Sequence, residues 1–184
     1  MAQSWRVRSG RRPHPRPPLD QEGLERLAFH YVGRYATTRA KLRDYLERKL
    51  RERGWGGERA ADTAALAERF AGLGLVDDRA FASARAASLA RRGYGERRVA
   101  EALKAAGVGE EEAAPAREEA ADRALEAALR FAERRRLGPF AAAAPDWPAR
   151  QKAAAAMLRA GHRIEVVRAV LNASPGEIPD SDGC

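Results

Sequence analysis

Apolar residues recur every three or four positions along most of the chain, which is the spacing that predicts amphipathic helices. The pattern is clearest in residues 76–108. There, a helix expected after Asp78 is interrupted by the glycine-containing turn 93–95 and followed at once by a second helix. On the second helix Val99 and Leu103 share an apolar face, while charged residues cover the opposite face. This stretch therefore predicts a helix pair with one side against a core.

Glycines punctuate the expected helices at a regular interval. Gly54, Gly107 and Gly161 each follow a helix-like segment, and they are separated by 53 and 54 residues. Glycine after the last helical turn readily adopts the positive φ that ends a helix. An apolar residue stands four positions before each glycine, namely Leu50, Leu103 and Met157. A unit of this size buries too little surface to be stable alone, so the register predicts tandem units that share interfaces.

We therefore predict an all-α fold, a tandem and elongated array of three three-helix repeats. The expected repeats cover residues 24–76, 77–118 and 119–173, the last with an inserted loop at 138–148, between a disordered basic tail at 1–20 and a C-terminal tail at 174–184. The expected helices are 24–35, 38–53, 58–71, 81–92, 96–106, 110–119, 120–137, 149–160 and 164–172, with Pro115 breaking the sixth. Gly93 and Gly95 permit the positive φ angles that a tight turn between two helices needs.

Composition narrows the class of protein. Charged residues make up 33% of the chain and aromatic residues only 7%, which favours solvated helices over a large β core. Cys184 is the single cysteine and the last residue, so neither an intrachain disulfide nor a cysteine metal cluster is expected. The sequence has no apolar run of about 18 residues and no apolar N-terminal stretch, which predicts a cytoplasmic protein without membrane spans.

The residue patterns of common catalytic sites are also missing from the sequence. It has no Gly-x-x-x-x-Gly-Lys loop for a nucleotide, and the glycines of the turn 93–95 are explained by chain reversal. His14, His30 and His162 are far apart in the sequence, which favours structural or surface roles over catalysis or metal binding. We expect a monomer with no enzyme activity, no cofactor and no metal.

Basic residues gather in two of the expected helix pairs. The net charge is +8, of which +5 comes from the arginines of residues 1–18, so the location of charge matters more than its total. The leading candidate for binding a partner surrounds the turn 93–95 and comprises Arg91, Arg92, Tyr94, Arg97, Arg98 and Lys104. A weaker candidate in the first repeat comprises Arg39, Lys41, Arg43, Arg48 and Lys49. Such residues can pair with carboxylates or phosphates, but they also fit a solvated helix face with ion pairs worth about 0.5 kcal/mol each.

Residues around the same turn resemble the RecX family of bacterial recombination regulators. The matching positions are Val76, Asp77, Asp78, Phe81, Arg92, Gly93, Tyr94, Gly95, Leu103 and Gly107. The chain departs from the family pattern where Leu89 replaces an arginine, Ala102 a glutamate and Arg85 an apolar or aromatic residue. The resemblance implies a tandem array of three-helix repeats. It further implies a regulator that binds the RecA filament on single-stranded DNA and inhibits its assembly, ATPase and strand exchange, with direct contact to single-stranded DNA left open.

Two other functions remain open from the residues alone. Three short helices with a glycine turn also describe a helix-turn-helix module that reads duplex DNA, although no strong base-reading pattern is present. Such a module would prefer particular sequences, whereas contacts made by charge alone would depend steeply on salt. The other function is that of a helical scaffold for a different acidic partner, which predicts no effect on RecA.

Overall fold

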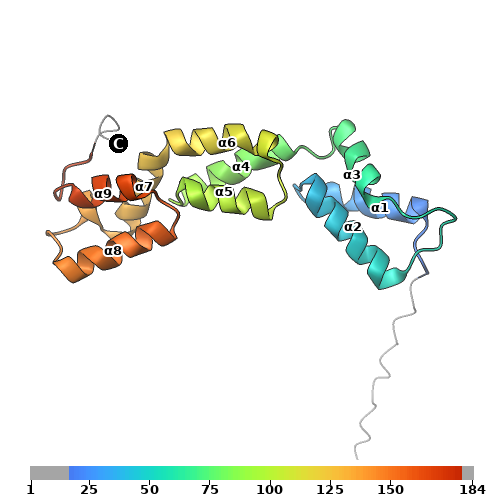
Figure 1. Ribbon diagram of the computed structural model, residues 1–184, viewed down its shortest axis with the longest axis horizontal. Coiled ribbons are helices and arrows are strands. Elements are labelled where there is room, and N and C mark those ends of the chain that lie inside the picture. Colours follow the sequence, from blue (N-terminus) through green and yellow to red (C-terminus); the bar gives the residue numbers. More distant parts are fainter. Residues whose placement is uncertain (1–16, 180–184) are drawn as a thin grey trace, which may run out of the picture.

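The computed structural model describes residues 17–179, which form nine α-helices and one short 3-10 helix. No strand is formed in this part of the chain, apart from an isolated bridge between Leu19 and Trp55. The helices follow one another in three groups along the long axis of the molecule (Figure 1). Each group encloses its own apolar cluster of buried side chains. The predicted all-α, elongated array is confirmed. The expected disorder of the N-terminal tail concerns residues that lie mostly outside the described ones. The exact limits of the repeats stay predictions.

The first unit consists of α1 (Gln21–Val32), α2 (Arg39–Arg53) and α3 (Thr63–Gly72). Each helix begins after a residue whose side-chain oxygen accepts a hydrogen bond from a first-turn amide: Asp20, Thr38 and Asp62. The position of the last of these caps explains why α3 begins at residue 63 and not at the expected residue 58. The largest fully buried side chains of this unit are Leu19, Leu24, Leu42, Leu46 and Phe70.

The second unit consists of α4 (Asp78–Arg91), α5 (Glu96–Ala105) and α6 (Glu110–Asp122). Its buried cluster comprises Ala82, Ala86, Leu89, Val99, Leu103, Ala113 and Ala116. The expected break of the last helix at Pro115 is wrong, because α6 runs through this residue without interruption. Proline removes one backbone donor, but the buried alanines on either side of it keep the helix packed against the core.

The third unit consists of α7 (Ala124–Arg135), the short 3-10 helix η1 (Gly138–Phe140), α8 (Trp147–Arg159) and α9 (Ile164–Asn172). The helix α8 begins earlier than expected, because Asp146 accepts a hydrogen bond of 2.9 Å from the Ala149 amide. Pro148 fits the first turn of this helix, where its missing amide would have no partner inside the helix. The loop expected at 138–148 is accordingly shorter and contains η1.

The closing glycines behave as their spacing predicts. They end the second helix of each unit at positive φ, with values of 79° at Gly54, 69° at Gly107 and 94° at Gly161. Gly93 also has a positive φ of 68°. Of the two glycines in this turn, Gly95 does not use the positive φ that glycine permits, because its φ is −78°. Glycine is required there by a close approach, since a Cβ at this position would lie 2.3 Å from the Gly161 carbonyl oxygen.

Neighbouring units are joined where the second helix of one meets the second helix of the next end to end (Figure 1). At the second junction, between α5 and α8, the amides of Gly95 and Arg97 donate to the carbonyls of Ala160 and Gly161 over 2.9 and 3.1 Å. The first amides and last carbonyls of a helix have no partners within it, so each helix end here satisfies the other. The contact also brings the positive end of one helix dipole to the negative end of the next.

A buried histidine completes the second junction. His162 is 1% exposed, its Nε2 lies 3.1 Å from the Gly93 carbonyl oxygen, and its ring meets Phe131 edge on. Burial lowers the pKa of His162 below its usual value, and the contact with Gly93 opposes this only in part. The ring is therefore neutral near pH 7, with its proton on Nε2, where it donates to the carbonyl.

The first junction repeats this arrangement between α2 and α5. The Thr38 hydroxyl, at the start of α2, donates to the Ala106 carbonyl over 2.6 Å. A Cβ on Gly107 would lie 2.3 Å from the Cβ of Ala40, so glycine permits this approach as well. The helices α2, α5 and α8 thus form a head-to-tail series across the three units.

Substitution of Leu103 tests whether this residue belongs to the core of the second unit. It is 1% exposed, and we expect Leu103→Ala to lower the free energy of unfolding by about 2–5 kcal/mol, because the deletion leaves a cavity. Chemical unfolding followed by circular dichroism measures this loss. The control is Lys104→Ala on the exposed side of the same helix, which should change stability by less than about 0.5 kcal/mol. A cost for Leu103→Ala close to that of the control would contradict its assignment to the core.

Alanine substitutions at Gly54 and Gly161 distinguish the cost of backbone strain from the cost of disturbed packing at the junction. A Cβ on Gly161 would lie 2.5 Å from the Arg98 amide nitrogen, whereas nothing lies within 4 Å of a Cβ on Gly54. We expect Gly54→Ala to cost about 1–3 kcal/mol from backbone strain alone, because its φ of 79° and ψ of 170° lie in a region that is essentially restricted to glycine. Gly161→Ala should cost about 1–3 kcal/mol more, because it also forces the junction apart. Thermal unfolding of the two variants measures the difference, and equal costs would show that the junction tolerates the extra atom.

Candidate functional site

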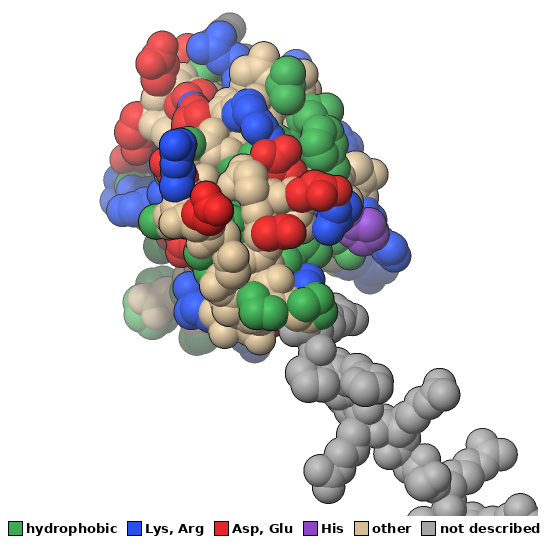
Figure 2. Space-filling model, turned by 90° about the vertical axis from the view of Figure 1, so that its right-hand side faces the viewer, with side chains coloured by type: hydrophobic (Ala, Val, Ile, Leu, Met, Phe, Trp, Pro, Cys, Tyr) green, Lys and Arg blue, Asp and Glu red, His purple; other side chains and the backbone are tan. Residues whose placement is uncertain are grey.

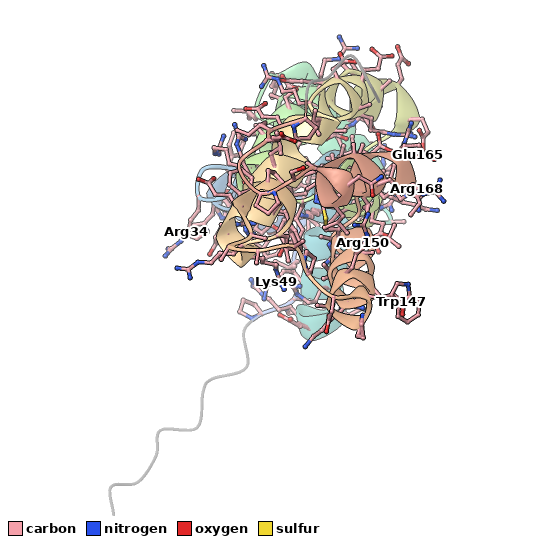
Figure 3. The ribbon with its side chains drawn as sticks, turned by 90° about the vertical axis from the view of Figure 1, so that its left-hand side faces the viewer. Arg34, Lys49, Trp147, Arg150, Glu165 and Arg168 are labelled. Carbon is pink, nitrogen blue, oxygen red and sulfur yellow. The ribbon has the colours of Figure 1, made fainter. Side chains whose placement is uncertain are left out.

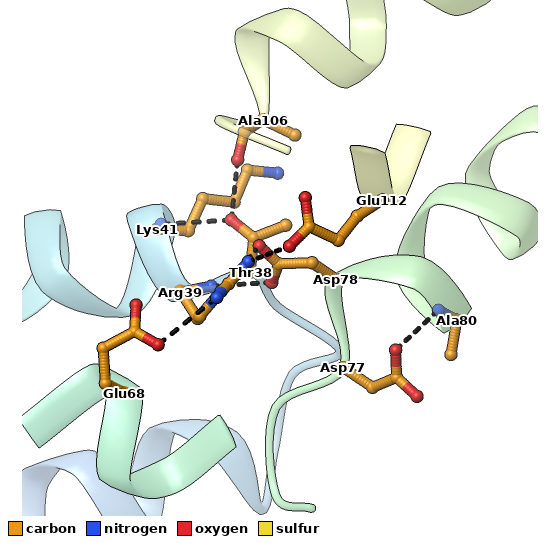
Figure 4. Close-up of polar contacts among 9 residues, drawn as sticks. All are labelled: Thr38, Arg39, Lys41, Glu68, Asp77, Asp78, Ala80, Ala106 and Glu112. Atoms are coloured by element: carbon orange, nitrogen blue, oxygen red, sulfur yellow. Dashed lines mark hydrogen bonds and ion pairs between the residues drawn. The ribbon is translucent and has the colours of Figure 1, made fainter. Parts of the chain in front are cut away.

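Arg39 lies in the first junction, where acidic side chains surround it (Figure 4). Its guanidinium group lies 3.2 Å from Asp78 and 3.2 Å from Glu68, and it also pairs with Glu112. Its backbone amide donates to Asp78 over 2.9 Å. These contacts raise the pKa of Arg39, with Asp78 the main cause and Glu112 the next. Because Asp78 and Glu112 belong to the second unit, Arg39 holds two units together and has little capacity left for an external anion.

Other predicted binding residues lie on separate surfaces. Arg43 stays within the surface of α2, 3.8 Å from Asp44 and 3.6 Å from Glu47. Arg97 lines a groove between α5 and α6. Arg91 and Lys104 are exposed in the last turns of α4 and α5. Arg48 and Lys49 pair with Glu52 of the same helix, at 3.7 and 2.6 Å. The structure does not bring these six cations together.

The remaining predicted residues meet in one groove. Lys41 from α2, Arg92 and Tyr94 from the turn, and Arg98 from α5 line a hollow of about 420 Å³. Arg85 from α4 lines the same hollow. We call this surface the basic groove. It combines one member of the weaker predicted patch with three members of the leading one.

Two neighbouring hollows share residues with the basic groove and extend it in both directions. A hollow of about 620 Å³ shares Tyr94 and adds Arg134, Arg135 and Arg159 from the third unit. A hollow of about 600 Å³ shares Lys41 and Arg85 and adds the aromatic residues Tyr35 and Phe81. The resulting surface, which we call the extended groove, includes residues from all three units.

Positive charge dominates the basic groove. Glu101 is the acidic residue in its lining, and it pairs with Arg98 at 3.1 Å in an exposed and therefore weak ion pair. Arg92 lies 5.2 Å from the ring centre of Tyr94, and this contact positions the guanidinium group without neutralising it. By contrast, acidic and basic side chains are interspersed over the end of the molecule that the first unit forms (Figure 2). The basic groove therefore suits a phosphate backbone or an acidic protein surface.

Four cations of the extended groove were not among the predicted binding residues. Arg85 stands seven positions before Arg92, which is two helical turns, so helical spacing could have identified it. Arg134 and Arg135 belong to the arginine run 134–136, whose local pattern indicates only the end of a helix. For Arg159 the sequence carries no signal, because its position depends on how α8 packs against the second unit.

Metal sites and membrane-spanning helices are two further features to consider in residues 17–179. No group of three or more His, Cys, Asp or Glu side chains in this part of the chain is placed to hold a metal ion. Among the described helices, none combines the length and apolar character required to cross a membrane. His162, a candidate ligand by residue type, is instead part of the second junction.

The three units, each with its own apolar cluster, define a helical-repeat protein. Residues 77–116 match the family model of the second three-helix domain of RecX. Regulatory protein RecX of Myxococcus xanthus is 33% identical over 160 residues, which cover 83% of this chain and 86% of the relative. Regulatory protein RecX of Agrobacterium fabrum is 33% identical over 156 residues, covering 83% and 84%. A crystal structure of RecX from Lactobacillus salivarius superposes with a TM-score of 0.63 at 16% identity, covering 82% of this chain and 94% of that one.

The chain belongs to the RecX family of regulatory proteins. Members of this family are regulators and not enzymes, which confirms the prediction from the sequence. The likeness to the solved structure independently confirms the fold.

Arg39→Ala should weaken the first junction. It leaves the Asp78 carboxylate, which is 6% exposed, without its main partner. We expect a loss of about 1–3 kcal/mol in the free energy of unfolding, less than for a fully buried pair because Arg39 is partly open to solvent. Arg43→Ala, on the same helix but with exposed partners, is the control and should cost less than about 0.5 kcal/mol. Equal effects in urea unfolding would contradict the structural role of Arg39.

Acid should reduce the difference between the Arg39→Ala variant and the parent protein. The pKa of Glu112 lies below its usual value of 4.5, mainly because of its own backbone amide and then because of Arg39. A carboxyl group with a lowered pKa in the folded state stabilises the protein above its unfolded pKa and loses this effect as pH falls through the folded pKa. The stability gap between parent and variant should therefore shrink below pH 4.5.

Proposed function

We propose that this chain binds the RecA filament on single-stranded DNA and restrains filament assembly, ATPase and strand exchange. Membership of the RecX family supports the choice of partner. The observation that carries the proposal is the basic groove and its extensions, which align cations from all three units on one surface. A filament presents the same surface repeatedly, so an elongated array with several contact points gains affinity from simultaneous contacts.

Charge is the main source of this affinity. The guanidinium groups of Arg85, Arg92 and Arg98 can each form paired hydrogen bonds with a carboxylate or a phosphate. Each exposed contact is weak, but a set of them on a fixed surface acts together. Because phosphates fit the same cations, direct contact with the single strand is part of the proposal. In this proposal the protein acts as a monomer in the cytoplasm.

Sequence-specific reading of duplex DNA receives less support from the structure. A helix-turn-helix module presents the first residues of its second helix to the bases in the major groove. The corresponding helix here is α5, and its first turn is bonded through Gly95 and Arg97 to the end of α8. These residues are therefore not free to enter a DNA groove. The other alternative, a helical scaffold for a different acidic partner, predicts no effect on RecA. Inhibition of RecA by this chain would therefore distinguish the proposal from it.

Arg85→Ala, Arg92→Ala and Arg98→Ala combined should release RecA from inhibition. Each lost contact is worth about 0.5–1 kcal/mol, so the concentration that inhibits the RecA ATPase by half should rise about tenfold or more. The assay uses RecA on single-stranded DNA with increasing amounts of the full chain. Circular dichroism and the melting temperature of the variant should stay close to those of the parent.

The matched control removes the same number of cations outside the basic groove. Arg43→Ala, Arg97→Ala and Lys104→Ala combined should leave inhibition close to that of the parent. Equal losses in the two triple variants would mean that overall charge, and not the basic groove, carries the contact. Absence of inhibition by the parent protein itself would rule out the proposed function.

A further inference from the structure

Three tyrosines of the first unit form a series of neighbouring rings, which we call the tyrosine ladder. Tyr31 of α1 and Tyr45 of α2 are stacked, with ring centres 4.2 Å apart and planes inclined by 12°. Tyr35, just beyond α1, lies 5.4 Å from Tyr31 and is tilted by 50°. Its amide donates to the Tyr31 carbonyl over 3.0 Å, so the backbone holds the outer ring beside the inner two.

Packing of the core explains the inner rings but not the outer one. Tyr31 and Tyr45 are half-buried and pack against the apolar cluster of the first unit. Tyr35 is 52% exposed and does not belong to this cluster. The ladder therefore ends in a large aromatic ring that is held in place and is open to solvent.

Cations surround the tyrosine ladder. Arg34 lies 6.0 Å from the ring centre of Tyr35, while Arg48 and Lys49 lie 5.5 and 5.8 Å from that of Tyr45. Glu52 pairs with both Arg48 and Lys49, whereas Arg34 makes no ion pair with an acid among residues 17–179. Arg34 projects from the side of the molecule opposite to the exposed Trp147 (Figure 3).

We infer that Tyr35 is a stacking platform for a base of single-stranded DNA, with Arg34 and Lys41 beside it to contact the phosphates. Exposed aromatic rings next to cations are the usual means of holding a single strand, because every base has a face that can stack. Tyr35 also lines the hollow that shares Lys41 and Arg85 with the basic groove, so a strand stacked on it leads into that groove.

A nucleic acid fits these features better than an acidic protein segment does. Carboxylates would pair with the cations but would leave the exposed part of the Tyr35 ring, which is 52% open to solvent, without a partner. Bases would cover the ring, and the phosphates between them would meet the cations. The choice of DNA rests on the proposed function, because a single strand of DNA is what a recombinase filament holds.

The test measures binding of the full chain to a labelled oligothymidylate of about 15 nucleotides by fluorescence anisotropy, without any recombinase. Tyr35→Ala should weaken binding about fivefold to a hundredfold, the loss that corresponds to one base stack. Tyr35→Leu, which keeps apolar bulk but no ring, should behave in the same way. Tyr35→Phe keeps the ring and should stay within about twofold of the parent.

An abasic oligonucleotide of the same length separates stacking from charge, because it carries the same phosphates without bases. The parent protein should bind it more weakly than oligothymidylate, and Tyr35→Ala should bind the two alike. Trp147→Ala is the matched control, because Trp147 is 69% exposed but lies on the side of the molecule opposite to Arg34, and this variant should keep the parent affinity.

Three results would overturn the inference. The first is parent-like affinity for oligothymidylate in a folded Tyr35→Ala or Tyr35→Leu variant. The second is an equal loss of affinity for both oligonucleotides, which would leave phosphate contact alone. The third is competition by polyglutamate that depends on Tyr35, which would identify an acidic protein segment as the ligand. This binding experiment contains no RecA. A negative result would therefore overturn the role of Tyr35 only, and the RecA ATPase assay would still decide the proposed function separately.

Discussion

End-to-end bonding between the second helices is the contact on which the array depends. The amides of Gly95 and Arg97 need acceptors, and the carbonyls of Ala160 and Gly161 need donors, because none has a partner inside its own helix. The bonds form only where the two backbones approach without a Cβ between them, as at Gly95 and Gly161. Units with small, alanine-rich cores thereby gain fixed positions relative to their neighbours.

These junctions turn side chains of separate units into one surface. The basic groove takes Lys41 from the first unit and its other cations from the second, so its shape depends on the angle at the first junction. Arg39 holds this angle by bonding acids of both units. Tyr94 acts similarly at the second junction, where it packs against the apolar clusters of two units. Arg39 and Tyr94 therefore set the spacing of the cations that would bind a partner.

Features that depend on neighbours in sequence could be predicted, and those that depend on distant residues could not. The cap at Thr38 and the closing glycines act within a few residues, so the local pattern reveals them. Gly95 is different, because local reasoning explains it by the turn alone, while the constraint that requires glycine is the close approach of Gly161 from another unit. Arg39 and Glu112 are 73 residues apart, and nothing in the helical spacing indicates that they meet. For the same reason, the sequence alone did not separate structural arginines from exposed ones.

The distribution of acids decides which cations are free to bind. Arg39 forms ion pairs with three acids, Glu68, Asp78 and Glu112. No residue of the acidic helix α6 lines the basic groove. Residues 1–18 hold five of the eight excess positive charges, so the rest of the chain has an excess of only three. The positive potential of the groove therefore arises from segregation of charge and not from a large surplus. A chain of the same composition with evenly spread acids would lack this surface, so the placement of the glutamates supports a binding role more strongly than the number of arginines does.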